Sequence, residues 1–443
     1  MLTGLHCVKL STNILQGEII KKYRIIPALL AVVLVAALGF FLLREAPETG
    51  VPFPPEEGIT LALATDLHYL APQLYDNGAL YTQMIENADG KTMKYIEELT
   101  EAFVCQIIES APDALILSGD LSFNGERDSH IMLAEKLRRV EAAGIPVLVI
   151  PGNHDLDSAK ASGFAGDSYY GVDSVNKREF EEIYADLGFR EALSRDGDSL
   201  SYMAQISPEL RVLMVDVNTQ AEPGFLDEST LNWIDDQLRL AAEAGAKVVA
   251  VSHQNLFQHN SLFRGGFVIG NGRLLGALFE KYGVICNLSG HMHIQHISQI
   301  ESGLTEIATS SLAVTPNQYG LLCLSESQAC YRTEAVNVDL WAASQGLDNP
   351  ELLHFREYAE AFFRDSSTRK ALTRLGEGRG ADALARAYSE INLAYFAGRM
   401  DTVDCSAQVL LRWNYRDKFT CEYIRSMCAD QGQNFTEYVF EPF

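Results

Sequence analysis

The stretch VLVIPGNHD (residues 147–155) joins a run of four apolar residues to three polar side chains of different chemistry. The apolar run predicts a short buried strand, which the Pro-Gly pair ends. Asn153, His154 and Asp155 then offer an amide, an imidazole and a carboxylate where the strand stops. Ligands of open α/β sheets collect beyond the carboxyl ends of the strands. The stretch therefore predicts a functional site at the rim of a sheet.

Up to about residue 334 the chain alternates such apolar runs with amphipathic helical stretches. The helical stretches lie at 92–110, 129–143 and 230–244, and the apolar runs at 59–65, 114–118, 147–150, 211–217, 247–252 and 284–288. This alternation predicts an α/β layered fold. Residues 201–206 and 211–217 flank Ser-Pro-Glu and predict a hairpin, so the sheet is expected to be mixed.

Four other apolar runs also end in residues that can bind metals. These residues are Asp66, His68, Asp120, His253, His291 and His293. In the Asp-x-His and His-x-His pairs, residues two apart on an extended chain point to the same side. We therefore expect all of these side chains to meet Asn153 at one rim of the sheet.

The composition of this set favours metal ions as its occupants. Two carboxylates held side by side repel each other unless a cation lies between them. Carboxylates combined with imidazoles suit two divalent ions bridged by Asp120, and they favour manganese, iron or zinc over calcium. Each motif alone has an ordinary explanation as a turn or a satisfied histidine. His259 and His296 are expected to be such loop histidines, whereas Asn124 is a candidate contact to phosphate.

A membrane anchor is expected near the N-terminus. Residues 25–43 carry no charge, and a helix of that length would be about 28 Å long, close to the thickness of a bilayer core. Basic residues precede it, so residues 1–24 are expected in the cytoplasm and the part of the chain after residue 44 outside the cell. The chain is then expected to be a single-pass protein of the cell membrane. A cleaved signal peptide is the alternative, although its apolar region is usually about 7–15 residues long. The proline-rich residues 44–57 are expected to be an extended linker.

The overall charge limits the partners of the chain. It carries 35 basic and 59 acidic residues, a formal net charge of −24. Such a surface repels nucleic-acid polymers, so no long nucleic acid is an expected partner. A small phosphoester remains compatible with this charge if metal ions supply positive charge.

The cysteines do not indicate a disulfide-scaffolded fold, because there are only 8 in 443 residues. Cys323 and Cys330 face each other across a predicted two-residue turn. They are either bridged or buried as free thiols.

The character of the sequence changes after about residue 335. Asn349-Pro350 predicts a helix start, and residues 350–364, 381–400 and 415–431 have helical periodicity. We therefore expect a catalytic domain at 58–334 and a smaller helical C-terminal domain at 335–443.

The five strand-end motifs, in this order, resemble those of the calcineurin-like metallophosphoesterase family: D-x-H, G-D, G-N-H-[DE], a lone H and G-H-x-H. The resemblance covers residues 58–334. It implies a four-layer α/β/β/α sandwich with mixed sheets and a two-metal centre at the rim. By position, the first metal would be held by Asp66, His68 and His293, the second by Asn153, His253 and His291, and both by Asp120.

The resemblance also implies a mechanism. A water bridging two cations has a lowered pKa and attacks phosphorus in line with the leaving group. His154 is not needed on a metal and would meet the leaving-group oxygen as an acid, with Asp155 orienting its ring and keeping it protonated. His68 and Phe123 stand where purple acid phosphatases have Gly and a metal-bound Tyr, which excludes that branch.

The residues around the motifs point to one branch of this family. LILSGDLSFNGERDSH (115–130) is similar to bacterial class III cyclic-nucleotide phosphodiesterases. ATSSLAVTPNQYG (308–320) is similar to a loop that those proteins place near the site. Some surface-anchored relatives also add a helical C-terminal domain.

The leading hypothesis is a membrane-anchored, outward-facing phosphodiesterase that acts on small nucleotides or cyclic nucleotides. A phosphomonoesterase with the same metal centre, such as a nucleotidase or a phosphoprotein phosphatase, is the close alternative. A third alternative is a non-catalytic surface interaction protein that works through its helical domain. The pair His154-Asp155 speaks against it, because such a protein needs no leaving-group acid.

Overall fold

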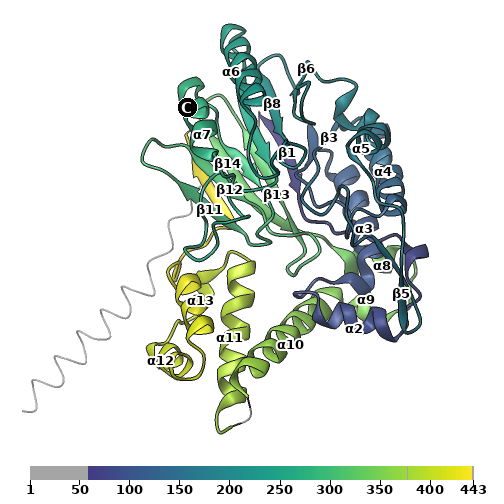
Figure 1. The fold of residues 1–443 in the computed structure, drawn as a ribbon, viewed down its shortest axis with the longest axis vertical. Coiled ribbons are helices and arrows are strands. Elements are labelled where there is room, and N and C mark those ends of the chain that lie inside the picture. The colour runs from purple at the N-terminus through teal and green to yellow at the C-terminus, as the bar shows by residue number, and fades with distance from the viewer. Residues whose placement is uncertain (1–57, 377, 442–443) are drawn as a thin grey trace, which may run out of the picture. The chain divides into compact units, whose positions relative to one another are not determined.

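The computed structural model describes residues 58–376 and 378–441, whose helices and strands are shown in Figure 1. Two mixed sheets hold most of the strands. The six-stranded sheet has the order β15-β14-β13-β1-β2-β3. Its strands are β1 (Ile59–Ala64), β2 (Ala114–Leu117), β3 (Val147–Val149), β13 (Gln318–Leu324), β14 (Ala329–Ala335) and β15 (Glu437–Phe440).

The seven-stranded sheet has the order β11-β12-β10-β9-β8-β7-β6. Its strands are β6 (Ser194–Arg195), β7 (Tyr202–Gln205), β8 (Leu210–Val215), β9 (Lys247–Ser252), β10 (Asn287–Ser289), β11 (His296–Gln299) and β12 (Thr305–Ala308). A separate hairpin consists of β4 (Ser162–Ala165) and β5 (Ser168–Gly171). Strands β7 and β8 pair antiparallel, which confirms the predicted hairpin.

Both sheets contain a set of parallel strands. β1 is parallel to β2 and β2 to β3, while β8, β9, β10 and β12 are parallel in the other sheet. The strands β2 and β3 are short and buried along their whole length, as expected for parallel strands covered on both faces. The loops after β1, β2, β3, β9 and β10 carry the sequence motifs.

The two sheets pack face to face. The hydroxyl of Tyr202 on β7 accepts a hydrogen bond from the Val149 N–H at 2.9 Å and donates one to the Val149 carbonyl at 3.1 Å. The hydroxyl of Tyr331 on β14 forms a hydrogen bond of 2.9 Å with Thr309 Oγ1, just after β12. Each of these bonds joins a strand of one sheet to a segment of the other.

Helices cover the outer faces of the sheets (Figure 1). Phe103 of α3 (Ile96–Ser110) packs on Tyr319 of β13, with ring centroids 5.5 Å apart. Helices α6 (Glu228–Glu243) and α7 (Gly272–Tyr282) share a buried hydrophobic cluster with β8 and β9. The other α-helices before β14 in the described residues are α2 (Ala79–Asn87), α4 (Arg127–Ala142) and α5 (Lys177–Ile183). The prediction of a mixed α/β fold is confirmed.

The region after β14 is largely helical, as predicted. Its helices are α8 (Val338–Ser344), α9 (Pro350–Leu353), α10 (Phe355–Leu375), α11 (Ala381–Phe396), α12 (Ala407–Arg416) and α13 (Lys418–Cys428). One helix was expected at 415–431, but α13 starts separately because the Asp417 side chain caps it and accepts a hydrogen bond from the Phe419 N–H at 2.9 Å.

The chain ends in a strand that the sequence did not predict. β15 pairs antiparallel with β14, so the C-terminal region extends the six-stranded sheet. Four residues give too short a pattern to distinguish a strand from a loop. All described residues belong to one compact unit.

The described part of the chain contains no helix long and apolar enough to cross a bilayer. The predicted segments 1–24, 25–43 and 44–57 lie outside the described residues.

The cysteines differ from the expectation in one respect. Cys323 and Cys330 face each other in the β13–β14 register, and both are free thiols. A disulfide that the sequence spacing did not indicate joins Cys405 to Cys428 in the helical region.

Candidate metal centre

The motif residues follow the strands on backbone that is not extended. Positive φ angles occur at five of them: 51° at Asp66, 46° at His68, 49° at Asp120, 67° at His291 and 60° at His293. The side chains of the Asp-x-His and His-x-His pairs do converge, but the expected reason, an extended backbone, is wrong. The side chains converge because left-handed turns direct them inward, a conformation that costs non-glycine residues free energy and is concentrated at functional sites.

Glycines let the motif loops approach one another closely. A Cβ at Gly152 would lie 2.2 Å from the amide nitrogen of Asp120, and a Cβ at Gly290 would lie 1.9 Å from Thr65 Oγ1. The residue before Asn153 and the residue before His291 must therefore be glycine for these loops to meet.

The first group of predicted ligands consists of Asp66, His68, Asp120 and His293, whose ligand atoms all lie within 4.8 Å of one another. His293 Nε2 lies 3.2 Å from Asp66 Oδ1 and 3.1 Å from His68 Nε2. His68 Nε2 lies 4.0 Å from Asp120 Oδ2.

The second group consists of Asp120, His253 and His291, with Asn153 beside them. His253 Nε2 lies 3.4 Å from Asp120 Oδ1, 3.1 Å from Asn153 Oδ1 and 3.2 Å from His291 Nδ1. Asp120 thus directs one carboxylate oxygen to each group. The structure brings together all seven predicted ligands.

Backbone carbonyls fix two of the imidazoles with one nitrogen facing the group. His253 Nδ1 donates to the Ser118 carbonyl at 2.9 Å, and His291 Nε2 donates to the Gly266 carbonyl at 2.9 Å. Orientation of a ligand histidine through its other nitrogen is common in metal sites. These two hydrogen bonds leave His253 Nε2 and His291 Nδ1 as the ligand atoms.

The pKa values reflect a dense set of charges. Burial alone would raise the pKa of Asp66 and Asp120, but His293 and His253 outweigh it and hold both below the usual range. Burial lowers the pKa of His291 to about 4. Burial also acts to lower the pKa of His253, yet the Asp120 carboxylate raises it to about 9. A proton on His253 would therefore compete with a metal for Nε2.

These residues fit two divalent cations. The buried Asp66 Oδ1 accepts no hydrogen bond of good geometry among the described residues and faces only the imidazoles of His293 and His68, at 3.2 and 3.9 Å. A cation between these groups would pair the carboxylate and the imidazole nitrogens at once. Carboxylate and imidazole donors in two groups that share one aspartate suit transition-metal ions.

His154 lies at the edge of the clusters. Its Nδ1 contacts the Phe123 carbonyl and Asn124 Oδ1, each at 3.1 Å, and its Nε2 lies 4.0 Å from Asp120 Oδ2. Because both partners of Nδ1 are acceptors, Nδ1 carries the proton and Nε2 faces the clusters.

The prediction that Asp155 orients the His154 ring is wrong. The Asp155 carboxylate is buried and accepts hydrogen bonds from the N–H groups of Leu121, Ser122 and Gly152 at 3.1, 2.8 and 2.8 Å. Asp155 therefore joins the loops after β2 and β3. Backbone N–H groups occupy its carboxylate oxygens, so the carboxylate does not orient the His154 ring. The ring is oriented by the loop that contains Asn124, which was predicted as a phosphate contact.

Lys91 is a charged residue near the clusters that the sequence analysis did not identify. Burial lowers the pKa of Lys91, while Asp89, Asp120 and Asp66 act to raise it. After burial, its charge is the largest influence that lowers the pKa of His68. Its ammonium group makes no hydrogen bond or ion pair with any residue in the described ranges. Lys91 lies just after a turn, in an isolated antiparallel β-bridge with Val314, and no recognisable motif surrounds it, so no sequence signal identified it.

His259 lies in a loop, as expected, but it is buried, whereas His296 is the first residue of β11. Their Nδ1 atoms lie 2.8 Å apart, His259 Nε2 lies 3.0 Å from Glu306, and His296 Nε2 lies 3.4 Å from Asp430. Burial lowers the pKa of His296. This chain of buried polar groups links β11 and β12 to the segment after α13.

The fold and the paired ligand groups define a dinuclear, metal-dependent phosphoester hydrolase. A model of the calcineurin-like phosphoesterase family matches residues 59–295, and a model described as the C-terminal domain of cyclic nucleotide phosphodiesterase matches residues 337–434. The chain belongs to the calcineurin-like phosphoesterase family.

Solved structures with a similar fold include a dimetal phosphatase from Danio rerio, at 14% identity and a TM-score of 0.46, covering 62% of this chain and 96% of that one. A purple acid phosphatase from yellow lupin (Lupinus luteus) is 16% identical with a TM-score of 0.42, covering 63% of this chain and 52% of that one. No curated protein matches the chain.

Proposed function

We propose that this chain is a phosphodiesterase that hydrolyses small nucleotides or cyclic nucleotides. The observation that carries the proposal is the match of residues 337–434 to the C-terminal domain of cyclic nucleotide phosphodiesterase. That match joins a phosphodiesterase-type C-terminal region to a dinuclear metallophosphoesterase site in one chain.

The metals would be held by the two residue groups that share Asp120. Asp66, His68 and His293 would hold one ion, and Asn153, His253 and His291 the other. Bound divalent ions lower the pKa of a nucleophilic water and stabilise charge on the phosphoryl oxygens. The donor set favours manganese, iron or zinc.

Two residues of the chain would act on the substrate directly. His154 donates through Nδ1, so the doubly protonated form of the ring carries a second proton at Nε2 that would pass to the leaving-group oxygen. The unpaired ammonium of Lys91 would lie near the phosphate and attract its negative charge.

We further propose that the catalytic part faces the outside of the cell. The Cys405–Cys428 disulfide supports this orientation, since disulfides persist in oxidising compartments. The charges around residues 25–43 support the same orientation.

The test compares initial rates of the full-length, manganese-loaded chain on bis-p-nitrophenyl phosphate and p-nitrophenyl phosphate. Asp120→Ala serves as the blank because Asp120 contributes an oxygen to both groups. We expect the diester to be hydrolysed faster than the monoester. In a second assay we expect cyclic AMP to be hydrolysed. Faster hydrolysis of the monoester would support a phosphomonoesterase instead. Turnover no greater than that of the blank on both would favour a non-catalytic interaction protein.

A further inference from the structure

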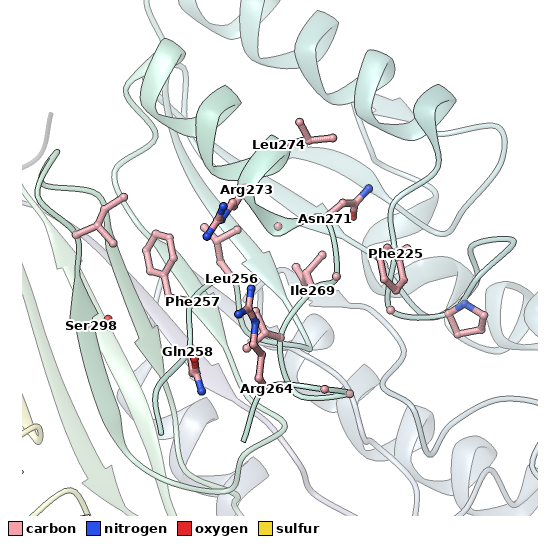
Figure 2. A pocket seen from close by; sticks show the side chains of 18 residues that line it. Phe225, Leu256, Phe257, Gln258, Arg264, Ile269, Asn271, Arg273, Leu274 and Ser298 are labelled. Atoms are coloured by element: carbon pink, nitrogen blue, oxygen red, sulfur yellow. The ribbon is translucent and has the colours of Figure 1, made fainter. Parts of the chain in front are cut away.

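A cavity of about 870 Å³ lies at the start of α7 (Figure 2). Gly266 lines this cavity, and its carbonyl accepts the hydrogen bond from His291 Nε2. The ring of Phe267 also packs on the His291 ring, with centroids 5.2 Å apart. The segment around Gly266 is therefore a wall shared by the cavity and the ligand group.

Two arginines line this cavity from different segments. Arg264 precedes the shared wall, and Arg273 lies in the first turn of α7. Figure 2 shows both guanidinium groups directed toward the same space beside Phe257. Neither guanidinium group makes a hydrogen bond or ion pair with any residue that the structure describes. No aspartate or glutamate lines the cavity among these residues.

Both arginines are exposed, and together they make this cavity a favourable place for an anion. Two like charges that share a space repel each other, and a cation in the first turn of a helix also opposes the positive end of the helix dipole. The chain has more carboxylates than cations, with 59 against 35, yet none reaches these two arginines in the described residues. A phosphate would accept bidentate hydrogen bonds from guanidinium groups and would be stabilised by the helix N-terminus.

The cavity also offers aromatic surface. The Phe225 side chain is 41% exposed, and its ring lies against Gly270, where a Cβ would come within 2.1 Å of the ring. Phe225 also lines the cavity, so this exposed ring is part of the cavity wall. Aromatic faces accept nucleobases with little sequence preference. Asn271 holds this wall in place through two hydrogen bonds to Leu226, of 3.0 and 2.8 Å.

We propose that this cavity binds a second phosphate of the substrate, together with the nucleoside that carries it, while the scissile phosphate lies at the metal groups. The substrate class is then a diester with an additional phosphate, such as a 5′-phosphorylated dinucleotide. This inference rests on the proposed phosphodiesterase function.

The test uses the full-length, metal-loaded chain with Arg264→Ala and Arg273→Ala combined. Bis-p-nitrophenyl phosphate has one phosphate and serves as the short substrate, and a 5′-phosphorylated dinucleotide is the long one. We expect KM for the long substrate to rise about tenfold or more, since losing even one hydrogen bond to a charged group weakens binding by about that factor. KM for the short substrate should stay within about twofold, because that substrate lacks the group that the arginines bind.

The control removes two exposed arginines elsewhere, Arg356→Ala and Arg386→Ala on α10 and α11, and should change neither KM. Arg264→Lys combined with Arg273→Lys keeps the charge without the bidentate geometry and should give an intermediate KM for the long substrate. An unchanged KM for the long substrate in the alanine variant, as expected if the cavity binds a separate effector, would overturn the assignment. Equal losses on both substrates would overturn it too. Failure of the proposed function is distinct, because the wild type would then not hydrolyse the short diester.

Discussion

His154 is the residue whose chemistry can be separated from metal binding. Its Nδ1 is held by the Phe123 carbonyl and Asn124, and its Nε2 faces Asp120 at 4.0 Å. A group in this position can protonate a leaving oxygen without holding an ion. Its contribution should therefore depend on how much help the leaving group needs.

Replacing His154 with Ala should lower kcat for a diester with an alkoxide leaving group by about 10²–10⁴-fold, the usual range for general acid catalysis. The loss on bis-p-nitrophenyl phosphate should be smaller, because p-nitrophenolate leaves without a proton. Rates on both substrates and the metal content of the variant provide the measurement. An equal loss on both substrates with full metal content would contradict the role of His154 as an acid.

Lys91 should matter for binding the negative charge of the substrate. Lys91→Met keeps the length of the side chain and removes its charge, so kcat/KM should fall about tenfold or more. Lys91→Arg should retain part of the activity. An unchanged kcat/KM in Lys91→Met would show that the ammonium does not act on the substrate.

Glu126 should make stability depend on pH. Burial raises its pKa to about 7 from 4.5, so between these values the folded state keeps a proton that the unfolded chain has lost. Stability therefore falls as the pH rises through this window, and the loss is complete above about pH 7. Glu126→Gln should be more stable than the wild type at pH 8 by up to about 3 kcal/mol, and close to it at pH 4.5.

Denaturant unfolding at the two pH values measures this effect. The exposed Glu222→Gln is the matched control and should shift neither curve. A Glu126→Gln variant with the same stability difference at both pH values would contradict the assignment.

At the scale of elements, the metal centre is built from the ends of strands. Alternating runs and helices in the sequence were enough to predict the mixed fold and the seven residues that meet. The sequence could not show how they meet, because left-handed turns at Asp66 and Asp120 depend on contacts between loops. Nor could it assign Asp155, whose partners are backbone N–H groups of another loop. Residue identity carries the chemistry, whereas tertiary contacts decide which neighbour each group faces.

The Cys405–Cys428 disulfide joins the segment before α12 to the end of α13. It closes a loop with a sequence separation of 23, which in the loop-entropy model is worth about 3 kcal/mol. Cys405→Ala with Cys428→Ala should lower the free energy of unfolding by about this amount. Adding reductant should destabilise the wild type and leave the variant unchanged. Cys105→Ala, which removes a free and partly exposed thiol, is the control. A variant as stable as the oxidised wild type would contradict the prediction.

At the scale of the whole molecule, the C-terminal helices pack against the segment that carries two of the metal ligands. Met292 and Ile294 alternate with the ligands His291 and His293, and both belong to the buried cluster formed by α10, α11, α12 and α13. Around them, Gln295 donates a hydrogen bond to the Phe435 carbonyl at 3.1 Å. The C-terminal region therefore fixes the backbone that carries two ligands.

Ile294→Ala should weaken metal binding without removing a ligand. Groups that position ligands typically change metal affinity by about 10–100-fold when they are altered. Metal titration of the full chain measures this change. Leu411→Ala, an exposed residue of α12 in the same region, is the control and should bind metal normally. Unchanged affinity in Ile294→Ala would show that the helices do not position the ligands.

The strand order of the six-stranded sheet has a consequence for biosynthesis. β1 lies between β2 and β13, and the sheet ends in β15, so its strands come from both ends of the described chain. A chain that emerges from the ribosome N-terminus first can pair β1, β2 and β3 early, but one edge of β1 stays open until β13 has been made. β15 joins later still, because helices α8 to α13 come before it in the chain. Nascent chains of this protein therefore carry an unpaired edge of β1 until residues 318–324 have been made, and during that interval the edge is open to pairing with other chains.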